Sequence, residues 1–306
     1  MKQINLFLLI ITGILLSNCS SGITEEIPQT GLPVGFSAFV EELSGETRAD
    51  AVTDVTSMGV FAYATKTTDF NWTTSLPNFM YNQQMTKNAT TGKWDYTPQM
   101  YWPLNTDEKI TFYAYAPHNN VITNNGDELS LSASTVPGLP TFIYTNNTAK
   151  TDLLLSTPIQ NRTNLDPNIR FTLKHALVKI SFSVQNFVPD VPKTVTSITV
   201  KARNKCTITE TQTNGISYDY DTSGGAATYS TGASFSIPLT TGDETVYPAA
   251  TFFLLPYMED ATYNVTYTVD DGSGQSVTTS DQSFPTAILW APGASIVYIL
   301  KIGATS

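Results

Sequence analysis

The His and Cys residues of this sequence are too few to offer much for a metal site or for a catalytic centre built on His. The 306 residues include only two His and two Cys. His118 and His175 lie far apart in the sequence, and neither has a Cys or an acidic ligand motif beside it. The turn at Asp270-Asp271-Gly272 lacks the alternating oxygen ligands of a calcium loop. We therefore predict no metal, no cofactor and no catalytic residue, and we interpret both His residues as structural.

Enzyme motifs that occupy a short stretch of chain are also missing from the sequence. It contains no phosphate-binding loop, no nucleophile elbow and no H-E-x-x-H zinc motif. A glycoside hydrolase needs only two carboxylates that are distant in sequence, so this class is the alternative that the residues leave open. We expect a protein that is not an enzyme.

The charge balance excludes a general nucleic-acid binder. Sixteen Lys and Arg oppose 26 Asp and Glu, which gives a net charge of −10 at pH 7. Nucleic-acid binding needs a basic face. Hydrophobic residues make up 41% of the chain and charged residues only 14%. The chain therefore has enough apolar surface for a core and too little charge for a disordered protein.

The amino terminus has the pattern of an export signal. Lys2 supplies a positive charge before an apolar run at residues 6–16. As a helix this run would span about 16 Å, whereas the hydrocarbon core of a membrane is about 30 Å thick. The run is therefore the core of a signal peptide rather than a membrane span. We predict a signal peptide at residues 1–18.

The end of this run carries the first candidate modification site. Leu16-Ser17-Asn18-Cys19 resembles the lipobox of bacterial lipoproteins, although Asn18 stands where Gly or Ala is usual. The resemblance implies cleavage before Cys19, acylation of its thiol and a lipidated tether at residues 19–32 that holds the protein to the outer membrane. Cys206 would then have no partner for an internal disulfide and is expected in the core. The alternative is an ordinary signal peptide that leaves Cys19 free or discards it.

Alternation of apolar and polar residues with a period of two predicts strands along most of the chain. Clear examples are residues 33–41, 58–64, 109–116, 178–185 and 295–302. Asn125-Gly126 and Asn214-Gly215 are hairpin signals, and the first of them is expected to join a strand at 121–123 to one at 128–132. Many short strands with frequent turns predict an all-β fold of antiparallel β-sandwiches.

The strand pattern pauses once, near the middle of the chain. Residues 158–167 carry two Pro together with Asn and Asp, which is typical of a linker. We place a domain boundary there, between an N-terminal β-sandwich at residues 33–162 and a C-terminal β-sandwich at residues 163–306. Each would hold about seven strands. Residues 221–232 are rich in Gly and Ser and are expected to form an exposed loop.

Several short phrases, taken together, resemble the fimbrillin family of type V pilus lipoproteins, also called Mfa-like fimbrillins. In chain order they are VGFS at 34–37, TR at 47–48, GVFAY at 59–63, YWPL at 101–104, ITFYAYAP at 110–117, DLL at 152–154, LKHALVKI at 173–180, LLP at 254–256 and WAPG at 290–293. The resemblance implies two tandem transthyretin-like domains, export as a lipoprotein, and assembly with other pilus subunits into fimbriae at the cell surface that serve adhesion.

The resemblance also implies a processing site. In fimbrillins an arginine-specific protease removes the first strand, and Arg48 lies in the polar segment 43–50 between the first two predicted strands. Exposed segments of this composition are preferred protease sites. The implied cut falls between Arg48 and Ala49. The alternative is that Arg48 is a solvated loop cation.

Loss of the first strand would leave a sandwich with an open groove, and such a groove favours addition of a strand from a neighbouring subunit. The best donor in the sequence is the last strand, at residues 295–302, whose length of about 26 Å is enough to fill it. Its alternate apolar residues would be the anchors. They are Ile296, Tyr298, Leu300 and Ile302.

Two other roles are consistent with the same residues. One is a monomeric surface lipoprotein that binds a glycan or a host protein, for which Trp72 and Trp94 in loop-rich stretches could supply stacking surfaces. The other is a pilus anchor that keeps its first strand. A receptor on a host or bacterial surface is an expected partner of an adhesive fimbrium.

Overall fold

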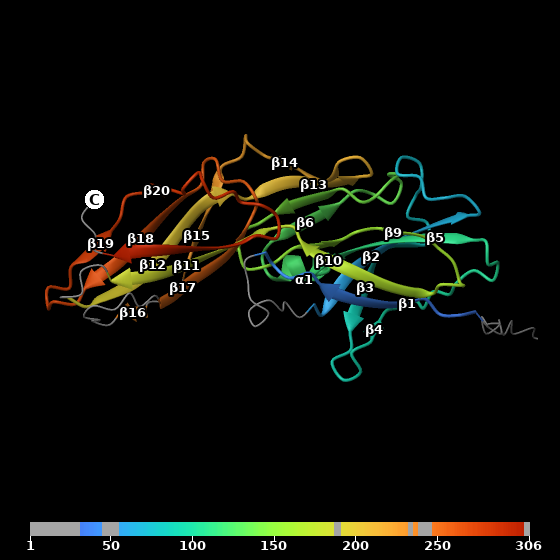
Figure 1. Cartoon of the computed structure of the whole chain (residues 1–306), viewed down its shortest axis with the longest axis horizontal. Helices are drawn as coiled ribbons and strands as arrows, with labels where there is room; N and C mark the ends of the chain where they lie inside the picture. Colours follow the sequence, from blue (N-terminus) through green and yellow to red (C-terminus); the bar gives the residue numbers. More distant parts are fainter. Residues whose placement is uncertain (1–30, 45–54, 187–190, 232–234, 238–246, 303–306) are drawn as a thin grey trace, which may run out of the picture. The chain divides into compact units, whose positions relative to one another are not determined.

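The computed structural model describes residues 31–44, 55–186, 191–231, 235–237 and 247–302 (Figure 1). Strands form most of these parts, as the alternating pattern predicts. The prediction of a mostly β fold is therefore confirmed, whereas the tandem transthyretin-like arrangement stays a prediction. Within the same ranges no helix has the length and apolar character needed to cross a membrane.

One eight-stranded sheet and one four-stranded sheet pack around a shared core. On the two central strands of the larger sheet, odd-numbered and even-numbered residues face opposite sides. Phe61 and Tyr113 lie in the core shared with the smaller sheet, whereas Val60 and Phe112 lie in a second cluster on the other face. The larger sheet has the order β1 (Gly35–Val40), β10 (Asn168–His175), β8 (Leu154–Ser156), β5 (Lys109–Ala116), β2 (Ser57–Lys66), β3 (Met80–Lys87) and β4 (Trp94–Asp95), with β9 (Ile159–Arg162) beside β5. The smaller has the order β14 (Gly215–Tyr220), β13 (Lys205–Thr211), β7 (Phe142–Thr145) and β6 (Glu128–Leu131).

A three-stranded sheet and a six-stranded sheet enclose a separate core. Inward residues of β11 and β12 supply much of it, among them Ile180, Phe182 and Ile198, which are almost fully buried. The smaller sheet has the order β17 (Tyr247–Leu254), β11 (Val178–Asn186) and β21 (Ser295–Ile302). The larger has the order β15 (Ala226–Ser230), β12 (Lys193–Arg203), β18 (Thr262–Val269) and β19 (Ser276–Thr278), with β16 (Phe235–Ile237) beside β12 and β20 (Gln282–Ser283) beside β18.

The chain passes between the two pairs of sheets more than once. Only Ala176 and Leu177 separate β10 from β11, and only Asn204 separates β12 from β13. The predicted boundary between residues 162 and 163 falls between β9 and β10, which lie in the same sheet. The two-domain division stays a prediction, and any dissection of the chain there would have to break that sheet.

Three local expectations were wrong. Residues 119–124 form the helix α1 (Asn119–Asn124) instead of part of a strand, because Gly126, with a φ of 96°, ends this helix rather than making a hairpin turn. The expected loop at 221–232 contains β15, which is anchored by the buried Tyr229. The sheets are also not purely antiparallel, since β1 pairs with β10, and β21 with β11, in parallel. By contrast, Asn214-Gly215 does join the antiparallel strands β13 and β14.

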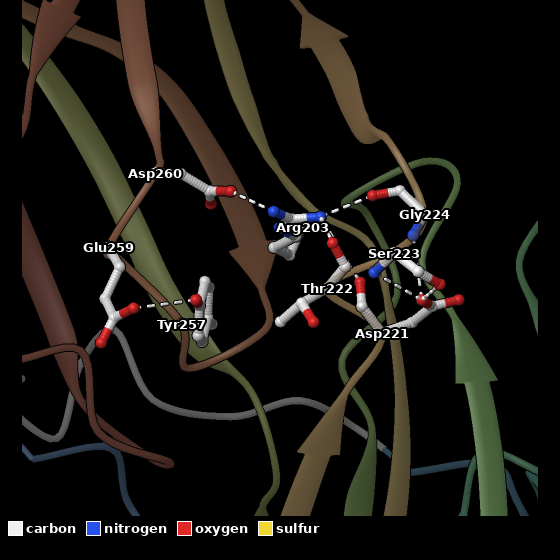
Figure 2. Close-up of polar contacts among 8 residues, drawn as sticks. All are labelled: Arg203, Asp221, Thr222, Ser223, Gly224, Tyr257, Glu259 and Asp260. Carbon is white, nitrogen blue, oxygen red and sulfur yellow. Dashed lines mark hydrogen bonds and ion pairs between the residues drawn. The ribbon is translucent and has the colours of Figure 1, made fainter.

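Arg203 holds two loops together at the end of β12 (Figure 2). Its Nη2 lies 2.6 Å from a carboxylate oxygen of Asp260. On its other side Nη1 donates to the carbonyl oxygens of Thr222, at 3.1 Å, and of Gly224. The Arg203 side chain is only 16% exposed, whereas that of Asp260 is 40% exposed, so these contacts lie at the edge of the core. They fix the loop after β14 and the loop after β17 at the point where the chain enters β13.

We expect Arg203→Lys to lower the free energy of unfolding by about 1–2 kcal/mol, because one ammonium group cannot reproduce the forked contacts to both loops. Urea denaturation followed by tryptophan fluorescence measures the change. Tyr257→Phe is the matched control, since it removes only the hydroxyl that donates to Glu259 at the surface of the second loop; no change is expected. Equal urea midpoints for Arg203→Lys and the unmodified protein would contradict the role of the fork.

Candidate assembly site at the first and last strands

The first strand lies at an edge of the eight-stranded sheet, and its only strand partner in the described parts of the chain is β10. The two strands run parallel, with Gly35 opposite Asn168 and Val40 opposite Leu173 (Figure 1). The strand alternates strictly: the side chains at 36, 38 and 40 pack against the core, whereas Gly35 and the side chains at 37 and 39 are exposed. Such a strand is held mainly by one row of backbone hydrogen bonds and one apolar face.

Phe36 is the main anchor of this apolar face. Its ring centroid lies 5.6 Å from that of Tyr96, 5.7 Å from that of Phe112 and 5.8 Å from that of Phe171. We call these three side chains the aromatic nest. Aromatic pairs at such separations stabilise by about 0.5–1.5 kcal/mol beyond the burial of their area. The aromatic nest is therefore a specific site for one aromatic side chain, placed two residues after Val34.

Polar contacts fix the start of the first strand. Val34 is 1% exposed, and its backbone N–H donates to the carbonyl of Met100 at 2.9 Å. The carbonyl of Val34 accepts from the hydroxyl of Tyr96 at 2.8 Å. Burial raises the pKa of Tyr96 above its ordinary value, so this phenol keeps its proton and stays a donor at neutral pH. The segment before β1 thus lies between β10 and the stretch that ends at Trp102.

The last strand, β21, has the same placement in the other pair of sheets. It lies at the edge of the three-stranded sheet and runs parallel to β11. Tyr298, Leu300 and Ile302 are buried, whereas Val297 and Ile299 are 57% and 53% exposed. The indole N–H of a buried Trp donates to the Tyr298 hydroxyl at 3.1 Å, and burial raises the pKa of this phenol.

The two edge strands follow one another along a single line. β10 continues into β11 after two residues, and each is paired in parallel with its own edge strand, so β1 ends where β21 begins. Ser44 joins them: its N–H donates to the carbonyl of Gly293 at 2.8 Å, and its carbonyl accepts from the N–H of Ser295 at 3.0 Å. The segment that contains the first strand therefore reaches the base of the last one.

A buried contact between His175 and Asp152 also supports the end of the first strand. His175 Nδ1 lies 2.5 Å from a carboxylate oxygen of Asp152, and both side chains are 3% exposed. The other ring nitrogen, Nε2, lies 2.9 Å from the carbonyl oxygen of Glu41. Because a carbonyl can only accept, Nε2 carries the proton of this bond. The pair orients the ring so that it holds the backbone just after β1.

The predicted site residues divide into two groups. Cys19, Arg48 and Ala49 lie outside the described residues. Of the four predicted donor residues, Ile296 is half-buried and the other three are buried against β11. Neither the aromatic nest nor the line of the two strands was predicted, because alternation shows which face of a strand is buried but not which strand lies beside it.

His118, interpreted as structural, and the two Trp residues considered as stacking surfaces for a glycan also have identifiable places. His118 caps α1 by accepting from the N–H of Asn120, and the Trp94 side chain packs half-buried beside the first strand's apolar cluster. Trp72 is half-buried and packs against Phe70 at 5.7 Å. Within the described ranges, no three His, Cys, Asp or Glu side chains are grouped so that they could hold a metal ion.

These features define a class of protein: one built of paired β-sheets, each pair with a parallel strand at an edge. Residues 47–306 match the model of the fimbrillin-like family. The chain therefore belongs to the fimbrillin-like family, as its sequence phrases indicate. This is a family of structural proteins, which confirms the prediction of a protein that is not an enzyme.

Individual relatives agree with this assignment. The chain is 30% identical over 194 residues to the fimbrium subunit Fim1C of Phocaeicola vulgatus, a match that covers 58% of this chain and 50% of the relative. The match thus spans half of the relative's length. The crystal structure of a candidate cell adhesion protein from Bacteroides uniformis superposes with a TM-score of 0.50 at 15% identity, over 88% of this chain and 92% of that one. This second likeness shows a shared fold.

Proposed function

We propose that this protein is a structural subunit of a type V fimbrium that is exported as a lipoprotein and serves adhesion at the cell surface. The observation that carries the proposal is the pair of edge strands in a member of the fimbrillin-like family. The relationship to a fimbrium subunit over more than half of the chain supports it. Its partners are other fimbrium subunits, with a host or bacterial surface as the target of the assembled fibre.

The assembly mechanism that fits these edge strands is strand exchange. A cut between Arg48 and Ala49 would release the segment that carries β1 and expose the apolar cluster that this strand covers. Burial of a Val or Phe side chain stabilises by about 1.5–3 kcal/mol, so the vacated groove strongly favours a new apolar strand. The last strand of another subunit supplies one, with an apolar face of the required spacing.

Surface extracts test the proposal as a whole. An antibody against this chain is expected to detect an SDS-resistant ladder of polymers, which heating in SDS converts to a single band. A single band in unheated extracts would contradict the fimbrium subunit and favour a monomeric lipoprotein that binds a glycan or host protein. One copy at the base of a fibre of other subunits, with its first strand retained, would favour an anchor.

Acylation of Cys19 has a separate test. Cys19→Ala is expected to abolish palmitate labelling in cells and to release the protein or block its processing, because the thiol is the atom that receives the lipid. Cys206→Ala is the matched control, and full labelling is expected to persist in it: Cys206 is buried in the core, where burial raises the pKa of its thiol to about 12. Labelling that survives Cys19→Ala would contradict the lipobox.

A further inference from the structure

We propose that the incoming last strand enters the groove of the next subunit in one fixed register, with Tyr298 inserted into the aromatic nest in the place of Phe36. This inference rests on the proposed strand exchange and adds the identity of the residue that determines the register. It assigns a new partner to Tyr96, Phe112 and Phe171, which hold Phe36 before processing.

The direction of the incoming strand follows from the pairings that both strands already make. β1 runs parallel to β10, and β21 runs parallel to β11. A strand that replaces β1 without reversing the hydrogen-bond pattern of β10 must therefore also run parallel to it. β21 makes this same pattern on β11 over eight residues, from Ser295 to Ile302, which is longer than the six residues of β1.

The alternation of side chains between the two faces of β21 allows few registers for this strand in the groove that β1 vacates. A shift by one residue would turn Tyr298, Leu300 and Ile302 to the solvent side and would place Lys301 on the groove side. Among the remaining choices, only one places an aromatic side chain where Phe36 lies. In that register Ile296, Tyr298, Leu300 and Ile302 take the places of Val34, Phe36, Ala38 and Val40.

The two neighbouring registers fit the groove poorly. Moved two residues one way, the strand would put Tyr298 at the place of Val34, which is 1% exposed and closed in by the stretch that ends at Trp102. Moved two residues the other way, it would put Tyr298 at the place of Ala38 and a β-branched aliphatic residue, Ile296, in the nest. Tyr298 already packs among aromatic rings in its own core, where its ring centroid lies 5.0 Å from that of Phe284 and 5.9 Å from that of Phe182.

Cysteine pairs across the assembled joint read the register directly. Arg170 is the Cα partner of Ser37 on the exposed face of the sheet. In the proposed register Ile299 takes the place of Ser37, so Ile299→Cys in the donor and Arg170→Cys in the acceptor are expected to form a disulfide. Val297→Cys and Lys301→Cys are the matched controls for the two shifted registers. All three donor positions are exposed, so these substitutions leave the cores unchanged.

The assembly uses full-length subunits mixed from two populations, one with the acceptor cysteine and one with a donor cysteine, oxidised after polymers have formed. Non-reducing electrophoresis after heating in SDS then counts cross-linked dimers, and mass spectrometry of the linked peptides identifies the joined residues. At least tenfold more dimer is expected for position 299 than for either control.

Each other outcome has a defined meaning. Cross-linking mainly through position 297 or 301 overturns the register while strand exchange stands. Normal polymers without any of the three cross-links overturn the strand-exchange proposal itself, because the donor then does not lie beside β10. Absence of polymers from the unmodified subunits would also overturn that proposal.

Substitutions of Tyr298 test whether its ring sets the register. Tyr298→Phe keeps the ring and removes the hydroxyl, which Phe36 also lacks, so cross-linking is expected to stay at position 299. Tyr298→Leu is expected to spread the cross-links over more than one position. A single position in both variants would show that the ring does not determine the register.

Discussion

Arg48→Ala is expected to yield a folded, lipid-bound monomer that does not polymerise. Without the cut, the segment that carries β1 stays paired with β10, and Phe36 keeps the aromatic nest occupied. The groove is then closed to any incoming strand. The heat-sensitive ladder in surface extracts should fall to background, while the monomer band persists. Polymers of normal length from Arg48→Ala protein would contradict cleavage-gated assembly and favour a subunit that keeps its first strand.

A reversible lock separates the cut itself from the departure of the strand. Ser37 and Arg170 are Cα partners on the exposed face, so Ser37→Cys with Arg170→Cys can hold β1 in place by a disulfide even after cleavage. This protein is expected to be processed but to stay monomeric until a reductant is added. Ser37→Cys alone is the control and should polymerise with or without reductant.

Holding the last strand in its own sheet is also expected to prevent polymerisation. This change acts on the donor strand, whereas Arg48→Ala acts on the acceptor groove. Ser181 and Val297 are Cα partners on β11 and β21. A disulfide between Ser181→Cys and Val297→Cys would prevent β21 from leaving, so the oxidised subunit cannot donate a strand. Oxidised protein alone should form no ladder, and reduction should restore it. Ladders of full length from the oxidised protein would show that β21 need not leave β11.

The same locked subunit gives a second readout, because its acceptor groove is unaffected. Added in small amounts to unmodified subunits, it is expected to accept one donor strand and to add no further subunit in the donor direction. Polymers should therefore shorten in proportion to the fraction of oxidised protein. Val297→Cys alone, which cannot form the lock, is the control and should leave the length distribution unchanged.

Much of the strand content could be predicted from sequence because side chains of a strand point alternately to its two faces. In β5 this pattern places Ile110 and Phe112 on one side and Tyr113 and Tyr115 on the other, as observed. The burial of both faces could not be predicted, since a Tyr is tolerated at a surface or in a core. Tyr113 and Tyr115 are buried because the four-stranded sheet packs against their side of β5.

The parts of the site that sequence could not reveal depend on contacts between distant residues. The pairing of β1 with β10 joins segments 133 residues apart in register, and alternation carries no information about strand direction. The His175–Asp152 pair likewise requires the approach of two strands that are not adjacent in sequence. The helix α1 was missed because a short run of Val, Ile and Thr has no measurable period, and the glycine after it suits either a turn or a helix end.

The contacts of Ser44 give the segment that contains β1 a second role, because they also hold the start of β21. This residue bonds to Gly293 and Ser295 at the base of β21, and a cut after Arg48 would carry it away together with β1. A single cut would then open the groove beside β10 and also remove the contacts that hold the start of β21. An unprocessed precursor would be inert at both ends, so subunits could accumulate during export without joining prematurely.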